Sequence, residues 1–181
     1  VMGAVIGYTV SFIAAGTMGL IQRNAGHPFF HCLGASRLDR TICSPAKEAG
    51  WKSVMGGTPA PHPDEVAESD LVILWGINAV ATNIHFLHSV KQAHKKGAKV
   101  WLIDTYQTLT SSVVDQTYIV RPGSDGALAL GLMHLLVRNN LIDHNFLAAH
   151  VQGFEELKER VLPDFTPEKV SSITGLSRET I

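Results

Sequence analysis

The chain has 181 residues, of which 45% are hydrophobic and 17% are charged, and its formal net charge is −1. This length suffices for one good hydrophobic core or two small ones. The near-neutral charge gives no electrostatic argument for a nucleic-acid partner or an anionic membrane. The two cysteines, Cys32 and Cys43, are too few for a disulfide framework and match no zinc or iron–sulfur spacing.

The first 22 residues, Val1–Gln22, carry no charged side chain, which raises the question of a membrane span. Four glycines and several hydroxyl side chains interrupt this apolar run, and no basic segment typical of a secretory signal precedes it. A strand over Ala4–Phe12, a turn at Gly16–Thr17 and a helix over Met18–Leu33 fit better, with Pro28 kinking or splitting the helix. We therefore expect no direct membrane span.

Cys43 stands before the pair Ser44-Pro45, which is typical of the N-cap and first position of a helix; we expect a short one, ending at Trp51. At such a place the helix dipole and the free N–H groups lower the pKa of a thiol. The resulting thiolate could ligate a soft metal or attack an electrophile. The alternative is a small buried residue, which is the commonest role of a lone cysteine.

The stretch Leu71–Asn83, LVILWGINAVATN, organises the rest of the chain. Leu71–Trp75 is a continuous apolar run with the length of a strand buried on both faces. Gly76 breaks the run, and Thr82 is placed to cap a helix from about Asn83 to Lys96. Strand, glycine-bearing loop and helix form the unit by which open α/β sheets hold ligands at the carboxyl ends of their strands. A bare crossover turn that binds nothing is the alternative.

Two further strands end in polar loops. Lys99–Ile103 is followed by Asp104, and an acid at the tip of such a strand holds ribose hydroxyls in nucleotide-binding folds. The hydroxyl-rich loop Asp104–Thr110 offers donors and acceptors, with a capping cluster as the alternative. A short strand over Thr117–Val120 then leads into Arg121–Asp125, RPGSD, which precedes a helix. A glycine beside an N-terminal carboxylate suits an amidine-like edge such as that of guanine, through paired hydrogen bonds.

Helices account for most of the remaining sequence. Capping residues and apolar spacing predict them over Gly126–Asn139, Asp143–His150, Phe154–Val161, Pro167–Ser172 and Ser177–Ile181, with Ser124 or Asp125, then Asp143, Thr166 and Ser177, as N-caps. Val1 has no initiator context and the last predicted helix starts only at Ser177, so we expect a piece of a longer protein. We expect a partial domain over 1–62 that contributes the Cys43 loop, a Rossmann-like dinucleotide-arm-binding domain over 63–141, and a helical continuation over 142–181.

In their order and spacing, the loops WGIN, DTYQT and RPGSD resemble those of the molybdopterin oxidoreductases of the dimethyl sulfoxide reductase family. That family includes formate dehydrogenases, nitrate reductases and polysulfide-type reductases. The resemblance covers most of Gly16–Leu141. It implies an α/β fold with a Rossmann-like, open, mostly parallel sheet and flanking helices in three layers.

The resemblance also implies a cofactor, molybdopterin guanine dinucleotide with Mo or W, and its contacts. The first loop would line the dinucleotide arm, the second would hold the ribose and guanosine end, and the third would read the guanine edge. The residues implied, in that order, are Trp75, Gly76, Asn78 and Thr82; Asp104, Thr105 and Thr108; and Gly123, Ser124 and Asp125. Cys43 matches the position of the protein ligand of the metal, and would be the catalytic residue.

The sequence departs from the family pattern at three places. Ala79 stands where proline commonly follows the loop asparagine, Thr105 stands where proline commonly follows the aspartate, and an arginine often found after the second strand is missing, with Leu109 near that place. These departures concern the nucleotide contacts more than the fold. The resemblance further implies a [4Fe-4S] cluster before Val1 and the second half of the cofactor site after Ile181, so the isolated piece would be inactive.

The implied function of the longer protein is a two-electron redox reaction on a small-molecule substrate, with an electron-transfer partner subunit or domain. Arg37, Arg40 and His62 either contact an anionic substrate or form surface salt bridges and a loop histidine. The alternatives are a metal-free scaffold or electron-transfer subunit of the same fold, a plain nucleotide-binding α/β domain, and a non-redox hydratase with the same cofactor. The substrate, the choice of Mo or W, and a cytoplasmic or periplasmic location stay open.

Overall fold

The computed structural model describes residues 26–36, 43–57 and 60–181, and the chain divides into two compact units, Val1–Ala60 and Pro61–Ile181. The predicted strand Ala4–Phe12 and the turn at Gly16–Thr17 lie outside the described residues. The three predicted domains, bounded at 62 and 141, stay a prediction. No helix within the described ranges is long and apolar enough to cross a membrane.

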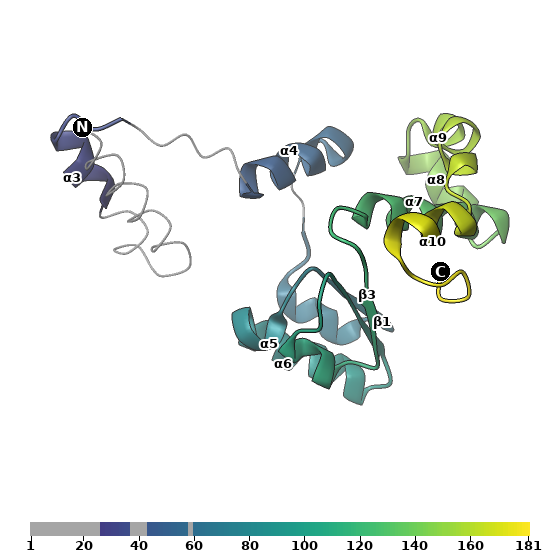
Figure 1. Ribbon diagram of the computed structural model, residues 1–181, viewed down its shortest axis with the longest axis horizontal. Helices are drawn as coiled ribbons and strands as arrows, with labels where there is room; N and C mark the ends of the chain where they lie inside the picture. The colour runs from purple at the N-terminus through teal and green to yellow at the C-terminus, as the bar shows by residue number, and fades with distance from the viewer. Residues whose placement is uncertain (1–25, 37–42, 58–59) are drawn as a thin grey trace. The chain divides into compact units, whose positions relative to one another are not determined.

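The described part of the first unit contains two helices, α3 (Gly26–Cys32) and α4 (Cys43–Met55) (Figure 1). Pro28 lies in the first turn of α3, where a missing N–H breaks no helical hydrogen bond, and α3 continues past it to Cys32. The part of the predicted helix before Gly26 lies outside the described residues, so a kink or split of that helix at Pro28 stays a prediction. Gly34, with φ +69°, follows the end of α3 as expected for a residue that stops a helix.

Helix α4 is longer than the sequence predicted. It begins at Cys43 itself, so the predicted N-cap at Ser44 is wrong, and it continues past Trp51 to Met55. An ion pair between Lys52 and Glu48, one turn apart at 2.6 Å, accompanies the extra turn.

The second unit is built on a parallel sheet of three strands in the order β1 (Leu71–Trp75), β2 (Lys99–Asp104) and β3 (Gln116–Ile119). Helices flank this sheet, so the predicted α/β class is confirmed. On one face, Leu74 pairs in register with Leu102, and both are buried against α6 (Ile84–Lys95). The 3₁₀ helix η1 (Pro63–Glu68) packs beside α6.

The opposite face of the sheet is covered only toward the carboxyl ends of the strands. There, Ile103 shares a core with Leu128 of α7 (Asp125–Arg138) and Val170 of α10 (Pro167–Thr174). Helices α7 and α10 pack directly on each other (Figure 1). Leu71 and Ile73, nearer the start of β1, are 45% and 41% exposed, so the prediction that this strand is buried on both faces is wrong.

Between α7 and α10 the chain forms three short helices, α8 (His144–His150), α9 (Phe154–Arg160) and η3 (Leu162–Asp164). Two predicted N-caps are confirmed here, because the side chains of Asp143 and Thr166 accept backbone N–H groups three residues on. The predicted helix over Ser177–Ile181 is wrong. Ser177 instead begins a turn that Thr180 closes with a backbone bond of 3.1 Å.

Candidate cofactor site

Three loops leave the carboxyl ends of β1, β2 and β3, and these ends meet at one edge of the sheet because the strands are parallel. The first loop begins at Gly76, whose φ of +64° is left-handed and whose N–H donates to the Ile103 carbonyl over 2.8 Å. This bond ties the first loop to the end of β2. The predicted residues of the first two loops are therefore neighbours at this edge.

A second bond joins the first loop to the third. The indole Nε1–H of Trp75 donates to the Asp125 Oδ1 over 2.7 Å, across 50 positions of sequence. Asp125 is exposed and is the first residue of α7. The carboxylate predicted to read a guanine edge is thus anchored through one oxygen, which leaves its Oδ2 free for a ligand among the described contacts.

The short helix α5 (Ala79–Thr82) follows the first loop, and Asn83 separates it from α6. Thr82 is the last residue of α5, so its predicted role as N-cap of the next helix is wrong. Its hydroxyl donates to the Asn78 carbonyl over 2.9 Å, and threonine in a helix commonly bonds in this way to the carbonyl four residues before it. This bond holds the loop, and a role for Thr82 toward the cofactor stays a prediction.

The Asn78 side chain contacts a residue that the sequence did not single out. Thr110 is fully buried, and its hydroxyl donates to the Asn78 Oδ1 over 2.9 Å and accepts the Val80 N–H over 3.2 Å. Thr110 lies within the hydroxyl-rich loop that the sequence indicated, but no local pattern distinguishes it from its neighbours. Its importance follows from contacts 30 and 32 residues away.

In the second loop, the half-buried Asp104 accepts the backbone N–H of Thr105 through Oδ1 at 2.7 Å. Its Oδ2 has no protein donor within the described residues and is available for a ribose hydroxyl. Thr108 is 8% exposed, and its Oγ1 accepts the Thr110 N–H over 3.3 Å as the N-cap of η2 (Leu109–Val113). Thr108 therefore caps a helix, as the alternative interpretation of this loop expected, whereas Asp104 still has a free acceptor oxygen among the described residues.

In the third loop, Gly123 has a φ of +80°, and a Cβ built there would meet nothing within 4 Å. This open backbone allows a flat ligand edge to approach closely. Ser124 is only 2% exposed, and its hydroxyl donates to the Arg121 carbonyl over 2.6 Å. Ser124 is the N-cap position of α7 but makes no side-chain cap bond, and its hydroxyl holds the turn through Arg121 instead.

The backbone of the first loop also offers donors. The N–H groups of Ile77, Asn78 and Ala79 have no protein acceptor in the part of the chain that the structure describes. Successive free N–H groups next to a left-handed residue form a concavity that favours anions. The loop therefore suits a phosphate group.

The Cys43 side chain lies outside the described part of the structure, so its role as a metal ligand stays a prediction. Within the described residues, no group of three or more His, Cys, Asp or Glu side chains could hold a metal ion. Arg37 and Arg40 also lie outside the described residues.

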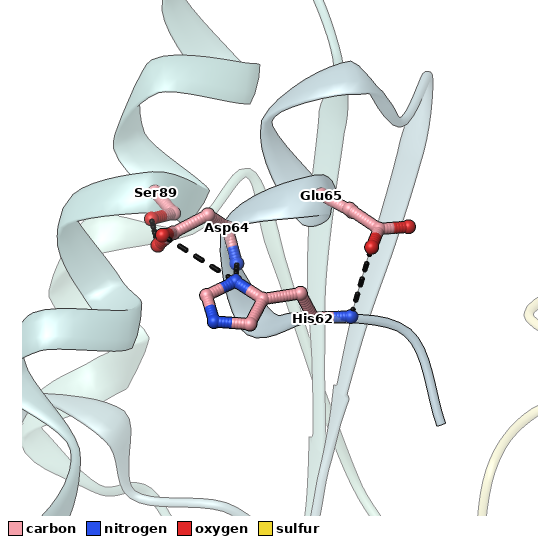
Figure 2. A network of polar contacts seen from close by, with 4 residues as sticks. All are labelled: His62, Asp64, Glu65 and Ser89. Atoms are coloured by element: carbon pink, nitrogen blue, oxygen red, sulfur yellow. Dashed lines mark hydrogen bonds and ion pairs between the residues drawn. The ribbon is translucent and has the colours of Figure 1, made fainter. Parts of the chain in front are cut away.

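His62 belongs to a local network at the start of η1 (Figure 2). Its backbone N–H donates to the Glu65 carboxylate over 3.0 Å, and its Nδ1 accepts the Asp64 N–H over 3.4 Å. Asp64 in turn accepts the Ser89 hydroxyl of α6 over 3.1 Å. His62 thus caps η1, and it lines, with Ile77 of the first loop, a cavity of about 780 Å³.

Comparison with known proteins identifies the family. The family model for molybdopterin oxidoreductase matches residues 15–173. The chain belongs to the molybdopterin oxidoreductase family. The resemblance drawn from the three loops is thereby confirmed.

Individual relatives agree with this assignment. The chain is 45% identical to a probable oxidoreductase, YoaE, of Bacillus subtilis over 92% of its length, and 32% identical to a nitrate reductase of Synechocystis over 84%. It is 29% identical to formate dehydrogenase H of Escherichia coli over 82% of its length. It spans only 24%, 22% and 21% of these proteins, respectively, which is between a fifth and a quarter of their length.

A solved structure supports the fold. The acetylene hydratase of Pelobacter acetylenicus superimposes with a TM-score of 0.70 at 24% identity, covering 88% of this chain and 23% of the hydratase. The Rossmann-like arrangement inferred from the strand and loop order therefore has a counterpart in a solved protein.

Proposed function

We propose that this chain binds the guanine dinucleotide arm of a molybdopterin cofactor, as part of a molybdenum or tungsten oxidoreductase. The bond between Trp75 and Asp125 carries the proposal, because it fixes an exposed carboxylate beside the glycine loop at the carboxyl edge of a parallel sheet. Family membership supports the molybdopterin part of the proposal. The dinucleotide part rests on the chemistry of the three loops.

The open groups of the three loops match the parts of a guanine dinucleotide in turn. The free N–H groups at 77–79 and the Asn78 amide are donors for phosphate oxygens. The Asp104 Oδ2 is an acceptor for ribose hydroxyls. The Asp125 carboxylate accepts from the guanine N1–H and N2–H groups, with Gly123 leaving room beside it.

The remaining roles follow from the same proposal. Cys43 would be the protein ligand of the metal, since a thiolate suits a soft metal centre. The bound cofactor supplies two-electron redox chemistry on a small substrate, while this chain's residues bind and orient it. A [4Fe-4S] cluster and an electron-transfer partner would be supplied by other parts of the longer protein or its complex. Relatives described as alpha subunits of F420-dependent formate dehydrogenases support such a partner.

Replacing Asp125 by asparagine tests the guanine contact. In Asp125→Asn the amide oxygen still accepts from Trp75, so the Nδ2 donor faces the donor edge of guanine and the paired hydrogen bonds are lost. Affinity for the nucleotide should fall by roughly tenfold to a hundredfold, the worth of one bidentate base contact. Guanine nucleotide released from the denatured full-length protein measures this.

Asp143→Asn is the matched control, because Asp143 is also an exposed carboxylate at a helix start but caps α8. Its guanine content should equal that of the wild type. Unchanged guanine in Asp125→Asn would refute the assigned contact, and a wild type without guanine would refute the proposed cofactor.

A further inference from the structure

The Thr110 hydroxyl has no contact with solvent, so its hydrogen-bonding capacity must be met by the protein. Thr110 is 0% exposed and lies in η2, which packs against α5. A hydroxyl has one proton to donate and two lone pairs that accept. One lone pair accepts the Val80 N–H over 3.2 Å, which leaves the proton and one lone pair for the Asn78 side chain.

The hydrogen-bonding capacity of the Thr110 hydroxyl decides which way the Asn78 amide faces. If the amide were turned over, the Thr110 hydroxyl would accept from both Asn78 and Val80, and its own proton would be buried without an acceptor. Such a buried unsatisfied donor is costly. The orientation in the structure avoids this cost, because the Thr110 proton goes to the Asn78 Oδ1 over 2.9 Å.

The orientation sets what Asn78 offers to a ligand. With its oxygen held by Thr110, both Nδ2 protons of this half-buried side chain remain without an acceptor among the described residues. The adjacent backbone N–H groups at 77–79 are also free there. All these groups are donors, so together they select an acceptor oxygen.

We propose that Thr110 is a positioning residue that locks the Asn78 amide as a donor toward the phosphate oxygens of the cofactor's dinucleotide arm. The inference rests on the proposed function and adds a residue that makes no contact with the cofactor itself. Thr110 acts through two hydrogen bonds, one that orients Asn78 and one that fixes the Val80 backbone. The hydroxyl, and not the bulk of the side chain, carries the role.

The test compares Thr110→Val, which keeps the shape and removes the hydroxyl, with Thr110→Ser, which keeps the hydroxyl, in the full-length protein. The first readout is amide hydrogen exchange in the peptide that contains Val80. The second is the rate at which bound guanine nucleotide is lost on dilution. Thr110→Val should speed exchange at Val80 and raise the rate of nucleotide loss about fivefold or more, the effect of one unsatisfied buried group. Thr110→Ser should resemble the wild type in both.

A double substitution tests whether the effect passes through Asn78. Asn78→Ala should itself speed nucleotide loss, and adding Thr110→Val to it should change the rate by less than Thr110→Val does alone, because only the Val80 bond is then left to lose. Full additivity of the two substitutions would overturn the positioning role.

Thr174→Val controls for the general loss of a buried threonine hydroxyl. Thr174 is also 0% exposed, donates to Val170 and accepts from Leu176, but it lies in α10. This variant should lower thermal stability while keeping its nucleotide. Equal nucleotide loss in Thr174→Val and Thr110→Val would overturn the inference, as would wild-type retention in Thr110→Val.

Absence of guanine in the wild type would overturn the proposed function and this inference with it. Normal guanine in the wild type with an unaffected Thr110→Val would overturn this inference alone.

Discussion

Asp115, in the segment before β3, contacts the start of β2 through one carboxylate oxygen and α6 through the other. Oδ2 accepts the Val100 N–H over 2.7 Å, and Oδ1 contacts the His94 Nε2 at 3.0 Å. The Val100 hydrogen bond, followed by the His94 hydrogen bond, lowers the pKa of Asp115 below its ordinary value of 3.8. The ionised side chain therefore favours the folded state.

We predict that Asp115→Asn destabilises the protein near neutral pH and that this difference disappears in acid. A carboxyl whose folded-state pKa is lowered stabilises the fold fully above its unfolded-state pKa. That stabilisation is lost as the pH falls below about 3.8 and through the lower folded-state pKa. Thermal unfolding of wild type and variant across this range measures the effect. A stability difference that persisted or grew in acid would contradict the assignment.

The residues that sequence patterns located and those that they missed differ in a physical way. Gly76, Asp104 and Gly123 follow strands at positions that the apolar runs and turn residues mark locally. Thr110 was missed, and Trp75 and Asp125 were located but the bond between them was not, because these contacts join residues 30 to 50 positions apart and no local pattern encodes them. Thr82 was misassigned because a further short helix, α5, intervenes before α6.

At the scale of elements, the contact between α7 and α10 depends on a glycine. A Cβ on Gly131 would lie 2.7 Å from the Val170 Cγ2, and Val170 is fully buried. The two helices therefore approach more closely than any other residue at position 131 would allow. This close packing places α7, whose first residue is Asp125, on the same core as the end of the sheet.

We predict that Gly131→Ala destabilises the protein by about 1–3 kcal/mol, the usual cost of overpacking a core. Gly126→Ala, in the same helix, is the matched control because a Cβ there meets nothing within 4 Å. It should leave stability unchanged or raise it by up to about 1 kcal/mol, since alanine is the better helix former. Thermal or denaturant unfolding measures both. Equal effects of the two substitutions on the free energy of unfolding would contradict the prediction, because a Cβ at position 131 would then cost nothing against Val170.

The boundaries of the strands could be predicted from the sequence, but how each strand is covered could not. The apolar run Leu71–Trp75 coincides with β1, and the strand predicted over Lys99–Ile103 coincides with β2, which also includes Asp104. Whether a strand is covered on one face or two depends on which helices reach it, so the exposed Leu71 and Ile73 could not be predicted. The helix predicted over the last five residues is absent, and Ser177 and Thr180 bond to each other in a turn instead.

At the scale of the whole molecule, the order of the three loops carried more information than any one of them. Each loop alone fits a capping turn, but their order and spacing matched a family that the comparison confirmed over residues 15–173. The chain spans between a fifth and a quarter of the length of the relatives described above. The activity we propose is therefore that of a longer protein, and the part that we propose for this chain is to bind the cofactor.

The central claim is best tested by the metal and guanine content of the full-length protein, in wild type and in Cys43→Ala. Molybdenum and tungsten are quantified by mass spectrometry, and the guanine nucleotide released on denaturation is quantified from the same sample. The account predicts metal together with guanine in the wild type, and much less metal in Cys43→Ala because the thiolate ligand is gone. Folded wild-type protein with neither metal nor guanine would contradict the account and leave only the fold.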